Sequence, residues 1–235
     1  MSKDAPGPIK ALMRFLLKLG WSVGAGGDDE YPRLFSRDLG ELPSRMEAGD
    51  VVLLGNGGGL SHVSMSIGGG MMIHSMATEQ TMRGWLGSIW DTLRRPIWWL
   101  TGRKEKTGVI KETLGEFLDR YERDAYAVLR RPGLTDEQRA RGVAKLESLV
   151  GKPYDYDFTH GDDEYYCSEL VVEFFEAALQ EKVEVETKAV KIPLVLDRQV
   201  IEPIAFLTAG DLQLVEASKS AWTTQKELLD GLARV

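Results

Sequence analysis

Cysteine is almost absent from this chain, since Cys167 is the single cysteine among 235 residues. One thiol has no partner for an internal disulfide, so the chain is not a disulfide-stapled scaffold. Histidine is also scarce, with three residues in the whole sequence. Chemistry that pairs a thiol with an imidazole therefore has few candidate residues. Because a free thiol fits a reducing compartment, we expect a cytoplasmic protein.

Long apolar runs and an excess of positive charge are missing as well. No stretch of 18 apolar residues occurs, so no membrane-spanning helix is expected. Residues 1–6 lack the basic region, apolar core and cleavage site of a signal peptide, so no cleaved leader is expected. The net charge is −7, which argues against a broad nucleic-acid-binding surface. We therefore expect no nucleic-acid partner.

Composition along the chain indicates one large domain with appendages. Residues 1–46 are interpreted as a basic amphipathic helix followed by an irregular extension, 47–217 as the main domain, and 218–235 as a helical tail. A Trp-rich insertion occupies 84–106, and its part 84–100 holds four of the six tryptophans. This segment is interpreted either as packing on the core or as a contact for a membrane surface, a lipid or a partner.

Hydrophobic periodicity predicts the elements of the main domain. Apolar residues at helical spacing after Cys167 predict a helix that begins at or just after the thiol. Thr135 and Gln138 form a capping box that opens another helix, which is expected to end at Gly151. A further helix is predicted over 110–121. Strands are predicted at 51–54, 62–67, 71–74, 126–130, 195–200 and 212–216.

The start of the helix behind Cys167 favours a reactive thiol. Unpaired N–H groups and the positive end of the helix dipole stabilise an anion there, and the thiolate is the reactive form. The backbone N–H of Cys167 is also a candidate donor to an oxyanion. A free cysteine that merely fills core space is the alternative. Glu169, in the same turn, is expected to complement the helix dipole rather than to act as an acid or base.

A glycine-rich hairpin brings two of the three histidines to one face. If 68–70 form a three-residue loop, Ile67 pairs with Met71, and His62 and His74 become diagonal neighbours on the same face. Such neighbours lie about 7–8 Å apart at the backbone, within reach of two imidazoles. A two-residue loop would put the two histidines on opposite faces.

Five short stretches together carry a resemblance to a known family. They are 49–53 (Gly-Asp-Val-Val-Leu), 61–68 (Ser-His-Val-Ser-Met-Ser-Ile-Gly), 73–75 (Ile-His-Ser), 151–157 (Gly-Lys-Pro-Tyr-Asp-Tyr-Asp) and 166–171 (Tyr-Cys-Ser-Glu-Leu-Val). In this order they resemble the circularly permuted papain-like amidases, the YiiX-like relatives of the NlpC-type peptidases. They also resemble the lecithin–retinol acyltransferase group. The resemblance covers roughly residues 47–180.

The resemblance implies an α+β fold, in which an antiparallel sheet packs on the helix that carries the nucleophile. It implies Cys167 as a thiol nucleophile and His62 as its base, and the permutation explains why the histidine comes first. His74 is expected to orient His62. Many YiiX-like members carry Glu at the position of His74, whereas the acyltransferase group carries His at this spacing. Tyr154 and Ser168 are the candidates for substrate or oxyanion contacts.

These observations predict a cysteine-dependent hydrolase of an amide or ester bond, of amidase or peptidase type, that works through a thioester without a metal or cofactor. The expected substrate is a peptide, an amide or an acyl-lipid. Acyl transfer, thioester hydrolysis on acyl-lipid and a non-catalytic lipid- or partner-binding module remain alternatives. Zinc binding by His62, His74, His160 and Cys167 is chemically feasible, but the tight ligand spacing of structural zinc sites is missing.

Overall fold

The computed structural model describes residues 46–55, 59–77, 106–120, 125–156, 158–159, 161, 163–190, 198–218, 221, 223 and 225–232. The predicted N-terminal extension up to residue 45, the Trp-rich segment 84–100 and His160 lie outside the described residues. Among the helices within these ranges, none has the length and hydrophobicity to cross a membrane.

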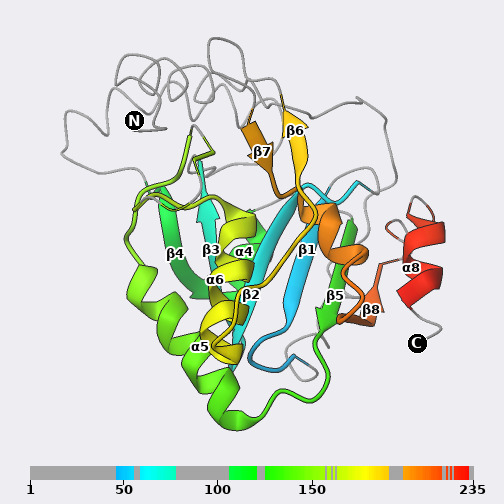
Figure 1. Ribbon diagram of the computed structural model, residues 1–235, viewed down its shortest axis with the longest axis horizontal. Helices are drawn as coiled ribbons and strands as arrows, with labels where there is room; N and C mark the ends of the chain where they lie inside the picture. The colour runs from blue at the N-terminus through cyan, green and yellow to red at the C-terminus, as the bar shows by residue number, and fades with distance from the viewer. Residues whose placement is uncertain are drawn as a thin grey trace.

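A six-stranded antiparallel sheet forms the centre of the fold (Figure 1). Its strand order is β4-β3-β2-β1-β5-β8. The strands are β1 (Val51–Gly55), β2 (His62–Gly68), β3 (Met71–Met76), β4 (Gly108–Thr113), β5 (Ala125–Arg130) and β8 (Gln213–Ala217). Two short strands, β6 (Lys188–Val190) and β7 (Arg198–Val200), form a separate ribbon.

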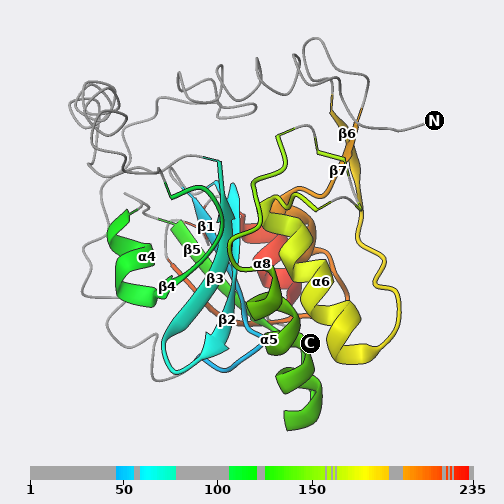
Figure 2. The same cartoon turned by 90° about the vertical axis from the view of Figure 1, so that its left-hand side faces the viewer.

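Helices cover both faces of the sheet, as Figure 2 shows from the side. One face carries α5 (Asp136–Leu149) and α6 (Cys167–Leu179), and the opposite face carries α4 (Leu114–Arg120). The 3-10 helix η1 (Pro203–Leu207) and α8 (Lys226–Leu232) follow later in the chain. This arrangement of helices on an antiparallel sheet confirms the predicted α+β class.

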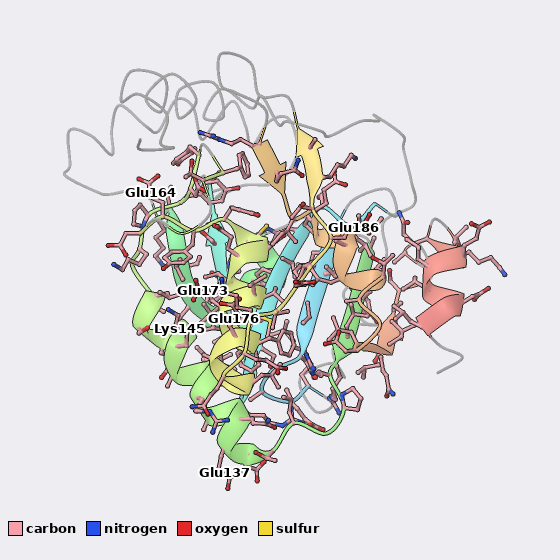
Figure 3. The ribbon with its side chains drawn as sticks, viewed as in Figure 1. Glu137, Lys145, Glu164, Glu173, Glu176 and Glu186 are labelled. Atoms are coloured by element: carbon pink, nitrogen blue, oxygen red, sulfur yellow. The ribbon has the colours of Figure 1, made fainter. Side chains whose placement is uncertain are left out.

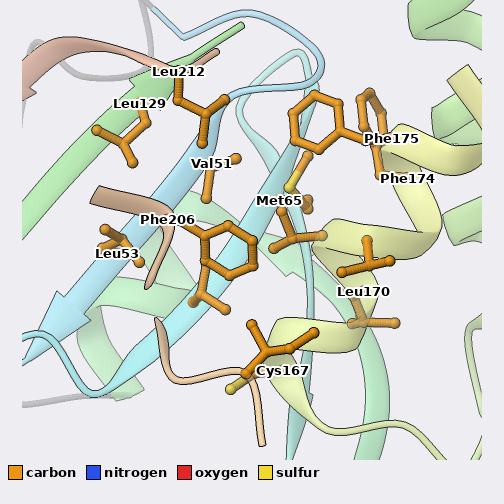
Figure 4. Close-up of a cluster of buried hydrophobic side chains, with 14 of the residues drawn as sticks. Val51, Leu53, Met65, Leu129, Cys167, Leu170, Phe174, Phe175, Phe206 and Leu212 are labelled. Atoms are coloured by element: carbon orange, nitrogen blue, oxygen red, sulfur yellow. The ribbon is translucent and has the colours of Figure 1, made fainter. Parts of the chain in front are cut away.

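Strand alternation divides the apolar core between the two faces. On the α6 side, Val51 and Met65 belong to a large buried cluster with Leu170 and Phe174 (Figure 4). On the α4 side, a smaller cluster includes the fully buried Phe117. Successive residues of a strand point to opposite faces, so each strand contributes to both clusters.

Most of the predicted elements are confirmed. Strands occur where the sequence predicts them at 51–54, 62–67, 71–74, 126–130 and 212–216, within a residue or two at each end. The predicted capping box of α5 is present, because the side chain of Gln138 accepts from the backbone of Thr135 at 2.8 Å and the Thr135 hydroxyl accepts from the backbone of Gln138 at 3.2 Å. The predicted strand 195–200 is described only from residue 198, where β7 begins.

The helix predicted over 110–121 is wrong in its first part. Residues 108–113 form β4, which pairs with β3 along its whole length, and α4 begins only at Leu114. The backbone of Val109 also bonds to Lys152 on the other edge. These long-range hydrogen bonds and the β-branched pair at 109–110 outweigh the helical spacing of the apolar residues. Burial alternates accordingly, with Glu112 buried between exposed neighbours.

The hairpin reaches the predicted register by a different turn. Ile67 does not pair with Met71, because Gly68 takes that place and Ile67 forms a bulge. The remaining two-residue loop, Gly69 and Gly70, has φ angles of 62° and 73°, which favour glycine. The bulge adds back the residue that the shorter loop removes, so Met65 still pairs with Ile73. The two histidines therefore share a face, as the longer loop would also have required.

Candidate active site

The two histidines form a direct hydrogen bond inside the protein. Nε2 of His62, the first residue of β2, lies 3.1 Å from Nδ1 of His74 in β3. The rings are close to perpendicular, with centroids 5.3 Å apart. His74 is fully buried, and His62 is 8% exposed. The predicted meeting of the two imidazoles is confirmed, and this bond occupies one ring nitrogen of His62.

A buried carboxylate extends the pair. Oε1 of Glu112 lies 2.8 Å from Nε2 of His74, and Glu112 is 5% exposed. In the β3–β4 register Glu112 faces Met72, so it is a diagonal neighbour of His74 on the same face of the sheet. The sequence prediction missed Glu112 because it assigned this stretch to a helix. Polarity does not alternate over 108–113, so the β-branched residues Val109, Ile110 and Thr113 are the one local feature that favours a strand.

An aromatic ring from α4 covers the histidine pair. The ring centroid of Phe117 lies 4.7 Å from that of His74 and 6.1 Å from that of His62. Phe117 is itself fully buried. This apolar cover lowers the local dielectric, which strengthens hydrogen bonds among the polar groups beneath it. The pair thus sits in a sheltered environment on the α4 side of the sheet.

Cys167 is the first residue of α6, as the sequence predicted, and is 8% exposed. It joins the margin of the large apolar cluster, and Figure 4 shows its sulfur pointing away from the labelled core side chains. The preceding loop is fixed to β3, because the hydroxyl of Ser75 donates to the carbonyl of Tyr165 at 2.5 Å. Ser75 follows His74, so the thiol and the histidines lie at the same end of the sheet.

The thiol of Cys167 and the imidazoles of His62 and His74 lie on opposite faces of the sheet, at the same end of it. Cys167 packs with residues on the α6 face, whereas the side chains of His62 and His74 belong to the α4 face with Phe117. His62 is the first residue of β2, an interior strand of the sheet, so it lies at one end of that strand. Helix α6, which begins with Cys167, packs against β2, which begins with His62.

Glu169 fixes the beginning of α6. Its buried carboxylate accepts a hydrogen bond from the backbone N–H of Tyr166 at 3.0 Å. The hydroxyl of Tyr166 in turn accepts from the backbone of Ile201 at 3.1 Å. Burial raises the pKa of Tyr166, and the nearby charge of Glu169 adds to the effect. These contacts support the structural role predicted for Glu169, since they hold the segment that presents the thiol.

Tyr154 lies in the electrostatic environment of Cys167. Burial raises the pKa of Tyr154 well above its usual value, and negative charge on Cys167 and on Asp155 raises it further. Its ring packs edge-on against Tyr156 at 5.1 Å between centroids. The Tyr154 hydroxyl therefore stays protonated at neutral pH and keeps its capacity to donate a hydrogen bond.

Ser168 is fully buried directly after the thiol. Its hydroxyl has no hydrogen-bond partner within the part of the chain that the structure describes. A role for this hydroxyl in binding substrate stays a prediction.

Residues 58–216 match the family model described as permuted papain-like amidase enzymes of the YaeF/YiiX, C92 family. The match spans more than half of the chain. The chain belongs to the permuted papain-like amidase family. This membership confirms the predicted fold class and the resemblance, and at a coarse level it assigns the chain to the cysteine hydrolases.

Two proteins named YiiX are similar to this chain. Over 81 residues the chain is 36% identical to the uncharacterized protein YiiX of Escherichia coli strain K12; the matched segment is 34% of this chain and 40% of that relative. It therefore spans less than half of the relative's length. The crystal structure of the metalloprotein YiiX from Escherichia coli O157:H7 is 22% identical, with a TM-score of 0.47, and the match covers 72% of this chain and 96% of that one.

A metal site was one of the alternatives for the histidines. Within the ranges that the structure describes, no group of three or more His, Cys, Asp or Glu side chains is placed to hold a metal ion. The fourth ligand considered from the sequence, His160, lies outside those ranges. The ring nitrogens that join His62 and His74 are already engaged with each other.

Proposed function

We propose that this protein is a cysteine hydrolase that cleaves an amide or ester bond through a thioester on Cys167. The observation that carries the proposal is the buried His62–His74 pair at 3.1 Å, at the end of the sheet where α6 begins with the chain's single cysteine. Papain-like enzymes pair a thiol at a helix start with an imidazole whose second nitrogen is held by a third group. Family membership supports the same assignment.

The proposed reaction begins at the thiol. Since Nε2 of His62 is bonded to His74, Nδ1 is the nitrogen that accepts the proton from Sγ of Cys167. The thiolate attacks the carbonyl carbon of the substrate, and the carbonyl π electrons move onto oxygen. When this tetrahedral intermediate collapses, the carbon–nitrogen or carbon–oxygen bond breaks, and His62 returns its proton to the leaving amine or alcohol. The acyl group remains on sulfur.

Hydrolysis of the thioester completes the cycle. His62 takes a proton from water as the water oxygen attacks the acyl carbon, and the thiol is released when the carbon–sulfur bond breaks. Helix α6 favours the thiolate with the positive end of its dipole. The backbone N–H of Cys167 and the protonated hydroxyl of Tyr154 are the donors that we assign to the oxyanion.

Acyl transfer is the second candidate. His74 stands where the acyltransferase group carries histidine, and the same thioester can pass to an amine or alcohol in place of water. Substrate classes under either reaction are peptides, small amides and acyl-lipids. Contact with a lipid surface or partner through 84–100 stays a prediction.

The test is a panel of peptide p-nitroanilides and p-nitrophenyl acyl esters, combined with intact-mass detection of an acyl adduct. Cys167→Ala and His62→Ala should each lower turnover by a factor of about 10² to 10⁴, with unchanged circular dichroism. Lys188→Ala, which changes an exposed residue of β6, is the control and should keep full activity. Equal labelling of Cys167→Ala and wild type by an acyl probe would contradict the proposal.

The same experiment separates the alternatives. A primary amine is added to the reaction with the ester substrate. If the thioester prefers acyl transfer over hydrolysis, the amide forms in place of the free acid. A non-catalytic module on the same fold gives no burst of released p-nitrophenol and no adduct at Cys167.

A further inference from the structure

We propose that Glu112 is a positioning residue that fixes which nitrogen of each histidine carries the proton. The structural half of this inference stands on geometry alone, and its catalytic consequence rests on the function proposed above. Glu112 lies on β4, one strand beyond the His62–His74 pair, so it acts through His74 and not on the substrate.

The carboxylate of Glu112 is placed to accept a hydrogen bond from the imidazole of His74. Its carboxylate is buried on the α4 face of the sheet and lies 2.8 Å from Nε2 of His74. The three other buried carboxylates of the described residues have structural partners: Asp50 binds Arg130 with both oxygens at 2.7 and 2.8 Å, Glu169 caps α6, and Asp155 accepts from the backbone N–H of Phe158 at 2.8 Å. Burying a carboxylate is costly unless a strong donor faces it. His74 provides such a donor.

The carboxylate of Glu112 determines which nitrogen donates and which accepts in each hydrogen bond of the chain from Glu112 through His74 to His62. A carboxylate only accepts, so Nε2 of His74 must carry the proton. In neutral His74 the other nitrogen, Nδ1, has a lone pair and accepts from Nε2–H of His62. Neutral His62 is left with its lone pair on Nδ1, the nitrogen that takes the thiol proton in the proposed reaction. Glu112 therefore sets the basic nitrogen of His62 from two side chains away.

Charge gives Glu112 a second effect on the same step. When a proton moves from Sγ of Cys167 to Nδ1 of His62, the buried pair gains a positive charge. The carboxylate of Glu112 is fixed at the far end of this pair, where it stabilises the imidazolium through His74. Replacing the carboxylate by an amide removes this charge and also removes the directionality, since a carboxamide both donates and accepts.

The first test reads the protons directly. Long-range ¹H–¹⁵N correlation of labelled protein distinguishes the two neutral tautomers of each imidazole, and the chain has three histidines to assign. Single His→Gln variants supply the assignments. In the wild type, we expect His62 and His74 both to carry hydrogen on Nε2 when neutral. A wild-type spectrum with the His74 proton on Nδ1 overturns the inference without any variant of Glu112.

The second test compares the carboxylate-to-amide change at Glu112 with the same change at Glu147, a residue of α5 that binds the neighbour of Glu112 in sequence. Glu112→Gln should mix the tautomers and lower kcat by about 10- to 100-fold, with KM unchanged, because Glu112 does not touch substrate. Glu112→Asp should keep the tautomers ordered and rescue part of kcat. Glu147→Gln, which removes an exposed carboxylate bound to Lys111 of the same strand at 2.5 Å, is the matched control and should leave both readouts unchanged.

The outcomes separate this inference from the proposed function. If Glu112→Gln keeps both the tautomers and the kcat of the wild type, the positioning role is overturned. If Glu112→Gln does not fold, Glu112→Asp and the wild-type spectrum still decide the question. Turnover that survives in Cys167→Ala defeats the proposed function while leaving the tautomer result intact. A misplaced His74 proton in a protein that needs both Cys167 and His62 defeats only the inference.

Discussion

The buried bond between Glu112 and His74 should make their substitutions strongly non-additive in stability. His74→Leu takes the imidazole N–H away from a buried carboxylate, which should cost about 3–5 kcal/mol in unfolding free energy. Glu112→Leu leaves a neutral imidazole N–H without that acceptor and should cost about 1–3 kcal/mol. The double variant replaces both polar side chains by leucine in surroundings that include Met72 and Phe117. No carboxylate is then left buried without a donor, so the double variant should cost about 1–3 kcal/mol in total. The midpoints of these three ranges give an expected coupling of about 4 kcal/mol.

Urea denaturation at pH 7, followed by tryptophan fluorescence and circular dichroism, measures the four unfolding free energies of the cycle. An exposed ion pair provides the control: Lys111 and Glu147 are bonded but are 38% and 46% exposed. Their cycle should give a coupling below about 1 kcal/mol. Additivity of His74→Leu and Glu112→Leu to within about 0.5 kcal/mol would refute the account of this buried network.

Three further predictions concern the elements around the site. Glu169→Ala should lower the unfolding free energy in urea by about 1–2 kcal/mol, and Glu169→Gln by less, because an amide oxygen still accepts from the helix start. Gly142→Ala should destabilise by about 1–3 kcal/mol, since its Cβ would lie 2.5 Å from Phe174. Gly115→Ala should not destabilise, because its Cβ would meet only the hydroxyl of Thr113, at an ordinary contact distance of 4.0 Å. Equal effects would contradict this packing. The pKa of Tyr154 is raised by burial, so the stability it contributes is complete below about pH 10 and is lost as pH rises through the folded-state pKa. Tyr154→Phe should accordingly flatten the fall of the unfolding free energy in alkali, and an unchanged slope would argue against it.

Local patterns in the sequence were sufficient for the elements that carry Cys167 and the two histidines. The apolar spacing after Cys167 predicts α6, and period-two alternation predicts β2 and β3. The position of His62 relative to His74 followed from the hairpin, although the turn itself was mispredicted. A bulge and a two-residue loop give the same register as the expected three-residue loop. Sequence spacing alone does not distinguish the two, because glycine permits either turn.

Glu112 was not predicted because its role depends on long-range pairing. Residues Ile110, Leu114 and Phe117 are spaced as on one face of a helix, and nothing local reveals that 108–113 is bonded to β3 and to Lys152. Only that pairing turns Glu112 towards His74. The packing of α6, which begins with Cys167, against β2 and β3 is equally non-local.

The most direct measurement of the central claim is the pH dependence of Cys167 alkylation by iodoacetamide. The chain has no other cysteine, so the adduct is unambiguous by intact mass. If Cys167 is a nucleophile activated by His62, wild-type alkylation stays fast well below the pH of about 8.5 at which an ordinary thiol titrates, and His62→Ala returns the profile to that value. A wild-type profile centred at or above about 8.5, and unchanged by His62→Ala, would contradict the claim.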